Sequence, residues 1–262
     1  MTGVFGHEAR FDALIVRVLA DGIALGEAAA RDAADVIVAA VGQTGEANVM
    51  LATGNSQVAF LAALTARPEV PWRQVRVFHM DEYVGLPANH PASFARYIAT
   101  HVTEHVRPME ANYLGQTASL AEAAKEADCY AARLRRHPLH LCVMGIGENG
   151  HLAFNDPGVA DFEDPLDVKV VALDQACRRQ QVGEGHFATL ADVPTHAITV
   201  TIPALLGAAH LAVVCPEARK AAAVSRALLG PVSTACPASI LRRQSHARLY
   251  LDAESAKGLQ PA

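Results

Sequence analysis

The sequence lacks any long apolar stretch, although 51% of its 262 residues are hydrophobic. No run approaches the roughly 20 uninterrupted apolar residues of a membrane-spanning helix, so we predict a soluble protein with no membrane partner. We also expect no signal peptide, since Glu8, Arg10 and Asp12 stand where its apolar segment would lie. These absences predict a cytoplasmic protein.

Cysteine is sparse, and the five cysteines are widely separated without any C-x-x-C pair. An odd number at such spacing argues against a disulfide framework and against a structural zinc site. The basic residues are scattered in a chain of net charge -5, which leaves no footprint for nucleic acid. We expect a reducing setting, no metal and no nucleic-acid partner, and the sequence leaves a homo-oligomer open.

Short apolar runs alternate along the chain with longer stretches of helical periodicity. Successive apolar residues are typical of strands buried on both faces, and we predict strands at 48–51, 75–80, 139–144, 168–173, 198–202, 211–215 and 248–251. We predict helices at 25–41, 56–66, 93–101, 119–136 and 217–228. This alternation indicates a doubly wound, mostly parallel sheet with helices on both faces, a Rossmann-like α/β fold. No linker or repeat interrupts it, so residues 1–262 are expected to form a single domain.

The expected sheet also predicts where a ligand binds. Loops converge beyond the carboxyl ends of parallel strands, where helix amino termini point free N–H groups at the ligand. Residues 157–167 and 177–193 are rich in polar residues and have weak periodicity, which favours a mobile flap over such a site. The strand-to-helix junctions are therefore the places to look for chemistry.

Gly145, Gly147 and Gly150 follow one predicted strand in the spacing G-x-G-x-x-G, the letter pattern of a dinucleotide-binding turn. That turn must pass straight into a helix, whereas residues 155–158 read Asn-Asp-Pro-Gly and break one. We predict that the match is fortuitous and that no organic cofactor binds. The glycines, Gly147 among them, instead let the backbone turn closely around a substrate.

The same junction crowds Asn149, His151 and Asp156 into eight residues. Histidine shuttles protons near neutral pH, and a neighbouring carboxylate can orient its ring. A packed, hydrogen-bonded histidine is the alternative. We predict His151 as a catalytic residue, with Asn149 and Asp156 beside it.

Two adjacent acids, Asp81 and Glu82, end another predicted strand. A carboxylate at this place is a candidate general base, because the apolar strand partly desolvates it and holds it near a substrate proton. An ordinary solvated turn acid is the alternative. We predict Asp81 as the base and Glu82 as a substrate-binding residue.

Hydroxyl and cationic side chains mark two further junctions. Thr53, Gly54, Asn55 and Ser56 follow a strand, and Ser56 is predicted to cap the next helix, which makes a cradle for phosphate. Lys220 is predicted in the first turn of a helix, where cations oppose the macrodipole unless an anion lies nearby. A plain capped turn and an exposed lysine are the alternatives. Together the junctions indicate proton transfer on a small phosphorylated sugar, such as an aldose-to-ketose isomerisation.

These residues also carry a family resemblance. The stretches LATGNSQ, HMDEYVGLPANHPASF, GIGENGHLAFNDPG, THAITVTIPALLGA, PEARKAA and CPASIL resemble successive motifs of the glucosamine-6-phosphate deaminase/isomerase family, in the group that includes 6-phosphogluconolactonases. The resemblance spans roughly residues 25 to 252. It implies hydrolysis of glucosamine 6-phosphate to fructose 6-phosphate and ammonia without an organic cofactor. It also implies that Asp81 moves a proton between C2 and C1, that His151 helps to open the ring, and that residues 53–56 with Lys220 bind phosphate.

The chain departs from the family pattern at two places. Asn149 stands where the family usually has Asp, and Asp156 stands where it has the longer Glu, so the group around His151 keeps one acid. The family's phosphate-binding arginine lies in an N-x-R-F-like segment, whereas this chain reads CRRQQVGEGHF. Arg178 or Arg179 is the candidate substitute, and Arg179 is predicted to bind substrate.

Three functions follow from this reading. The first is an amino-sugar-phosphate deaminase. The second is a related isomerase or a 6-phosphogluconolactonase, although the DEY acids and the FNDP ending favour the first. The third is a sugar-phosphate-sensing module that kept the pocket and lost the chemistry, for which Asn149 is the sequence hint.

Overall fold

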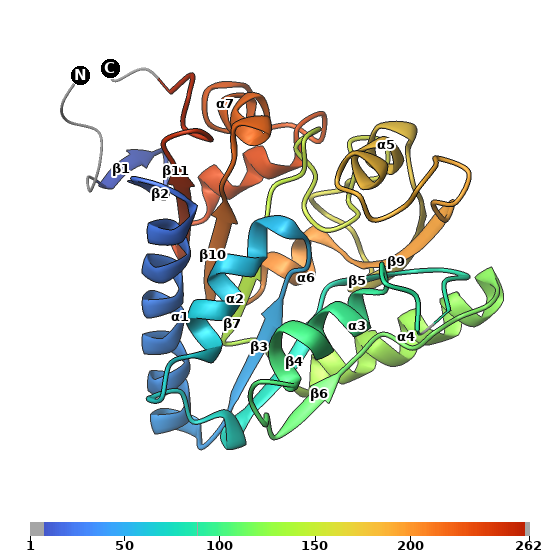
Figure 1. Cartoon of the computed structure of the whole chain (residues 1–262), viewed down its shortest axis with the longest axis horizontal. Coiled ribbons are helices and arrows are strands. Elements are labelled where there is room, and N and C mark those ends of the chain that lie inside the picture. Colours follow the sequence, from blue (N-terminus) through green and yellow to red (C-terminus); the bar gives the residue numbers. More distant parts are fainter. Residues whose placement is uncertain (1–7, 88, 260–262) are drawn as a thin grey trace.

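An eight-stranded sheet forms the centre of the computed structural model, which describes residues 8–87 and 89–259 (Figure 1). In spatial order its strands are β1 (Glu8–Phe11), β2 (Leu14–Leu19), β11 (Ala247–Asp252), β10 (His210–Cys215), β7 (Leu141–Met144), β3 (Ala47–Leu51), β4 (Val75–His79) and β6 (Glu110–Asn112). All neighbouring pairs are parallel except β1 and β2, which form a hairpin. The predicted mostly parallel sheet is confirmed.

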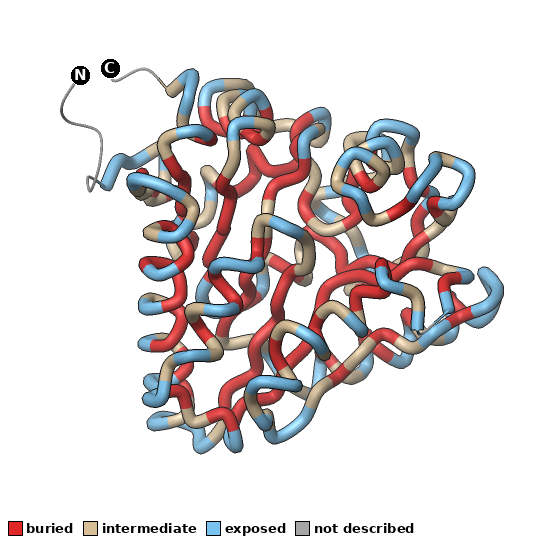
Figure 2. Tube along the Cα trace, viewed as in Figure 1, coloured by how far each residue is buried: buried red, intermediate tan, exposed pale blue. Residues whose placement is uncertain are grey.

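Helices cover both faces of this sheet. Helices α1 (Gly22–Thr44) and α2 (Val58–Thr65) share one hydrophobic cluster with Val49 and Leu51 of β3. Helices α4 (Leu120–Arg136) and α7 (Ala221–Leu229) share the other with Met50 of the same strand. Alternate residues of a strand point to opposite faces, so both are buried, which explains the continuous apolar runs. Figure 2 shows the central strands buried along their length.

A second, three-stranded sheet was not predicted. It consists of β5 (Asp81–Tyr83), β9 (His196–Val200) and β8 (Val168–Ala172), and both of its pairings are antiparallel. The assignment of the stretches 168–173 and 198–202 to the parallel sheet is therefore wrong, and residue 202 begins helix α6 (Ile202–Leu206). An apolar run reveals a buried strand but not its partner or direction.

The prediction of a mobile flap at 177–193 missed a helix. Helix α5 (Gln175–Gly183) is capped by Asp174, whose side chain accepts a hydrogen bond from the backbone N–H of Cys177 at 2.6 Å. The helix buries Cys177 and Gln181, which are four residues apart on one face. One buried stripe of two residues is too short a pattern to detect in sequence.

Helix α3 (Phe94–Ile98) lies where a helix was predicted. Within the described ranges no helix is long and apolar enough to span a membrane.

Candidate functional site

A pocket opens beyond the carboxyl ends of β3, β4, β7 and β10, where the sequence predicted a site. It is lined by residues 52–56, Met80, Asp81, Phe94, residues 145–147, His151, Ala153, Phe154, Gln180, Gln181, Glu184, His186 and Lys220. Predicted residues from four separate junctions therefore meet in one cavity, although Glu82, Asn149 and Asp156 do not line it. Asp81 and His151 supply titratable groups, whereas residues 53–56 and Lys220 supply hydroxyl, amide and ammonium donors.

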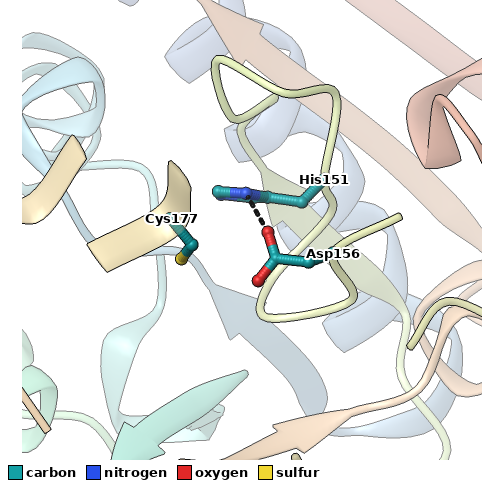
Figure 3. A group of neighbouring side chains, drawn as sticks. All are labelled: His151, Asp156 and Cys177. Atoms are coloured by element: carbon teal, nitrogen blue, oxygen red, sulfur yellow. Dashed lines mark hydrogen bonds and ion pairs between the residues drawn. The ribbon is translucent and has the colours of Figure 1, made fainter. Parts of the chain in front are cut away.

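The imidazole of His151 is held by a carboxylate (Figure 3). Its Nδ1 lies 2.9 Å from Oδ1 of Asp156, and the side-chain oxygen of Asn149 accepts the His151 backbone N–H at 3.0 Å. Asn149 also donates from Nδ2 to the same Asp156 oxygen at 2.7 Å. Burial raises the pKa of Asp156, but the hydrogen bonds and charge of His151 and the Asn149 amide outweigh it and lower the pKa overall. Asp156 thus stays ionised beside the ring, and Asn149 supports it with a donor rather than a second charge.

The glycine-rich loop serves this histidine. No helix directly follows Gly150 in the described chain: after β7 the next element is β8, and residues 145–167 form loop and turns. The backbone N–H of Gly147 donates to the carbonyl of His151 at 3.0 Å, and that of Gly150 donates to the Gly147 carbonyl at 2.9 Å. The loop therefore folds back on itself, and the helix amides that a pyrophosphate needs are absent from it.

Asp81 lies in β5 rather than in a solvated turn. It is 6% exposed and lines the pocket, and its Oδ1 is buried without a hydrogen-bond partner in the described structure. Burial raises the pKa of Asp81 well above its usual value, and the charge of Glu82 adds to this. An unpartnered, desolvated carboxylate is a strong proton acceptor when ionised, which suits a general base.

Glu82 points away from the pocket and is fully buried. Its carboxylate accepts hydrogen bonds from Ser93 Oγ at 2.9 Å and from the backbone N–H groups of Phe94 and Ala95 at 3.2 and 2.9 Å. These donors belong to the first turn of α3, so Glu82 anchors that helix. The structure does not bring Glu82 to the pocket, since side chains alternate along β5 and Asp81 takes the pocket side.

The predicted phosphate cradle is a tight turn rather than a helix cap. Gly54 has φ = 103°, which a side chain would strain, and residues 55–57 form a single 3-10 turn before α2 begins at Val58. The prediction that Ser56 caps the helix is wrong, because this extra turn places Gln57 at the helix start. Thr53, Gly54, Asn55 and Ser56 nevertheless all line the pocket.

Lys220 is 4% exposed and lines the same end of the pocket. It ends a 3-10 turn and is the residue directly before α7, so it lies one residue outside the helix whose first turn it was predicted to occupy. Its Nζ lies 3.9 Å from Oε1 of Glu184, beyond hydrogen-bond distance, and donates no hydrogen bond within residues 8–87 and 89–259. A buried ammonium with unused donors is typical of an anion-binding site.

The two candidate arginines do not reach the pocket. Arg179 is exposed and donates to Gln175 at 2.6 Å, while Arg178 donates to the backbone carbonyls of Leu190 and Val193. Sequence reasoning instead missed Glu184 and His186, which line the cavity from the same segment. Residues 183–186, which read GEGH, show no periodic pattern that marks a site. Only the packing of this segment against residues 53–56 reveals that Glu184 and His186 line the cavity.

Three side chains together could hold a metal ion. Donor atoms of His151, Asp156 and Cys177 lie within 4.8 Å of one another, with Cys177 contributed by α5 (Figure 3). The sequence argument against a metal rested on cysteine spacing, which cannot detect a ligand from a distant element. The His151–Asp156 hydrogen bond already accounts for two of the three groups.

Comparison with known proteins adds to this geometry. The model of the family "Glucosamine-6-phosphate isomerases/6-phosphogluconolactonase" matches residues 20–251. A glucosamine-6-phosphate deaminase of Exiguobacterium sibiricum is 35% identical over 206 residues, 79% of this chain and 79% of the relative. One from Pseudarthrobacter chlorophenolicus is 31% identical over 233 residues, 88% of each chain.

Solved structures with the same fold come from two kinds of enzyme. A monomeric glucosamine-6-phosphate deaminase superimposes with a TM-score of 0.82 at 27% identity, covering 93% of this chain and 99% of the other. A 6-phosphogluconolactonase from Trypanosoma brucei gives 0.76 at 20% identity, covering 94% and 98%, a likeness of fold alone.

Proposed function

Because the chain belongs to the family of glucosamine-6-phosphate isomerases and 6-phosphogluconolactonases, we propose that it is a glucosamine-6-phosphate deaminase. In this proposal it converts glucosamine 6-phosphate and water to fructose 6-phosphate and ammonia in the cytoplasm. The observation that carries the proposal is the buried Asp81 carboxylate, whose Oδ1 has no hydrogen-bond partner among the described residues. It shares one cavity with His151 and with the buried ammonium of Lys220.

His151 acts first, on the pyranose ring. Its imidazole gives a proton to the ring oxygen and takes up the proton that the C1 hydroxyl loses, so that the ring opens to the aldehyde. Asp156 holds the imidazole through Nδ1, which leaves Nε2 directed to the substrate. Asn149 supports Asp156 in this role.

Asp81 acts next, on the open chain. Its carboxylate removes the proton from C2 while His151 gives its proton to the C1 oxygen, and an enolamine forms. Asp81 then returns its proton to C1, which leaves a hydroxyl at C1 and an iminium at C2. Water adds to the iminium carbon and loses a proton to His151, and the carbinolamine expels ammonia to give the ketose. Lys220 and residues 53–56 bind the phosphate, and the binding energy of that remote group positions C1 and C2 at the acid and the histidine.

Ammonia release from glucosamine 6-phosphate by the purified protein tests the proposal, with formation of fructose 6-phosphate as the second product measured. Equal amounts of both products support it. A ketose without ammonia, or hydrolysis of 6-phosphogluconolactone instead, would assign the chain to a related phosphosugar enzyme. Binding of the sugar phosphate without any product would leave a sugar-phosphate-sensing module.

A further inference from the structure

Glu184 stands at the end of the pocket that the proposed function gives to phosphate. It directly follows α5, and its side chain is 7% exposed. The Asn55 side-chain amide donates to the Glu184 backbone carbonyl at 3.4 Å, which joins this segment to the cradle of residues 53–56. A carboxylate therefore lies inside a site that is expected to receive a dianion.

Every polar group around this carboxylate is a donor. Gln180 Nε2 lies 2.8 Å from it, Arg219 Nη1 3.1 Å, His186 Nε2 3.3 Å and Lys220 Nζ 3.9 Å. Burial raises the pKa of Glu184, but the nearby His186 ring nitrogen, the hydrogen bond from Gln180 and the charges of Lys220 and Arg219 lower the pKa to about 2. The group is thus an anion at neutral pH, and its donors are of the kind that bind phosphate oxygens.

Lys220 and Glu184 cannot both keep their positions beside a bound phosphate without a cost. Two negative groups within about 4 Å of one buried ammonium repel each other strongly, because solvent screens them poorly. An incoming phosphate must either displace the Glu184 carboxylate from its donors or bind while that carboxylate repels it. In both cases the phosphate affinity is reduced by the presence of Glu184.

We propose that Glu184 is an internal competitor for the substrate's phosphate, a carboxylate that neutralises the cationic end of the empty pocket and yields its donors when phosphate binds. This inference rests on the proposed function, since it takes the phosphate site from it. It makes Glu184 a residue that sets substrate affinity without contacting the reacting carbons. It also explains how a buried Lys220 is tolerated in the absence of ligand.

Isothermal titration with inorganic phosphate tests the proposal. The isosteric substitution Glu184→Gln removes the charge, and we expect it to tighten phosphate binding by about tenfold or more at low salt. Glu217→Gln is the matched control, because Glu217 also pairs with Arg219, at 2.5 Å, but does not line the pocket. The control should shift the affinity by less than about threefold.

Thermal unfolding provides a second measure of phosphate affinity. Without phosphate the Glu184→Gln variant should be less stable than the natural protein, since its cations have lost a partner. Added phosphate should stabilise the variant more than the natural protein, because the gain grows with ligand concentration over the dissociation constant. This measurement still decides the matter if the variant is too unstable for titration.

Lys220→Met separates this inference from the proposed function. If phosphate binding depends on Lys220 but Glu184→Gln leaves it unchanged or weakens it, Glu184 is not a competitor although the phosphate site stands. Equal tightening by Glu184→Gln and Glu217→Gln also overturns the inference, because general charge would then explain both. If phosphate binds equally well to Lys220→Met, the site itself is misplaced and both proposals fall.

Discussion

The imidazole of His151 fills the space where a Cβ on Gly147 would lie, with Cε1 and Nε2 each 2.2 Å from that position. Gly147 thus has no room for a side chain, because the His151 ring packs directly against its backbone. This contact explains the middle glycine of the G-x-G-x-x-G spacing without a dinucleotide.

Gly147→Ala should therefore displace the His151 ring and lower turnover by about 10² or more, since misplacement of a reacting group by about 1 Å costs that much. Steady-state assays of ammonia release measure the loss. Gly158→Ala is the matched control, because a Cβ there meets nothing within 4 Å. Similar losses in both variants would contradict the steric explanation.

Asp81→Asn should lower turnover by roughly 10² or more while the variant still binds glucosamine 6-phosphate, because the amide keeps the shape of the base but cannot accept the C2 proton. Turnover and calorimetric binding are measured on the same preparation. Asp128→Asn, on the exposed face of α4, serves as the control. Near-normal turnover in Asp81→Asn would remove Asp81 from the role of base.

Lys220→Ala should weaken binding of phosphorylated sugars by about 1.5 to 3 kcal/mol, the scale of a charge-assisted hydrogen bond. Binding of unphosphorylated glucosamine should barely change, because the ammonium faces the phosphate end of the pocket. Lys125→Ala, an exposed lysine of α4, is the control. Equal losses for both ligands would show that Lys220 is structural.

Asn149→Asp tests the departure from the family pattern. A carboxylate at this position would face Asp156 across the present 2.7 Å hydrogen bond, and two such acids cannot both ionise easily. The apparent pKa of the acid pair should rise, so the acid limb of the pH–rate profile should move to higher pH. Asn149→Ala removes the hydrogen bond without adding charge and should not produce this rise; an unchanged acid limb in Asn149→Asp would refute the expectation.

The free energy of unfolding should depend on pH in part through the protonation of His79. This side chain is fully buried and accepts the Leu114 N–H at Nε2, and burial lowers its pKa from 6.5 to about 3. Below pH 6.5 the unfolded chain binds a proton that the folded chain does not, so stability is lost as pH falls toward 3, by up to about 1.4 kcal/mol per pH unit.

His79→Gln keeps an acceptor for Leu114 but cannot titrate. The difference in unfolding free energy between the natural protein and this variant should therefore shrink as pH is lowered from 6.5 to 5. Urea unfolding at several pH values measures it, and the other histidines cancel in the comparison. A difference that is constant with pH would show that His79 titrates normally.

The sequence by itself determined the parallel sheet and the four junctions that meet at the candidate site. Apolar runs predicted β3, β4, β7, β10 and β11, because strands buried on both faces allow few polar residues. Residues 53–56, Asp81, His151 and Lys220 were found at strand ends, and parallel strands bring their carboxyl ends to one edge, so these residues converge without any special contact.

Only the tertiary structure decided which neighbour each of these residues has. Asp81 and Glu82 are adjacent in sequence, yet the alternation of β5 sends one into the cavity and the other beneath α3. Glu184 meets Lys220, and Cys177 approaches Asp156, through the packing of α5 over the pocket. These contacts depend on the separate antiparallel sheet and on the paths of the loops. Many weak contacts set those paths, and they leave no periodic pattern in the sequence.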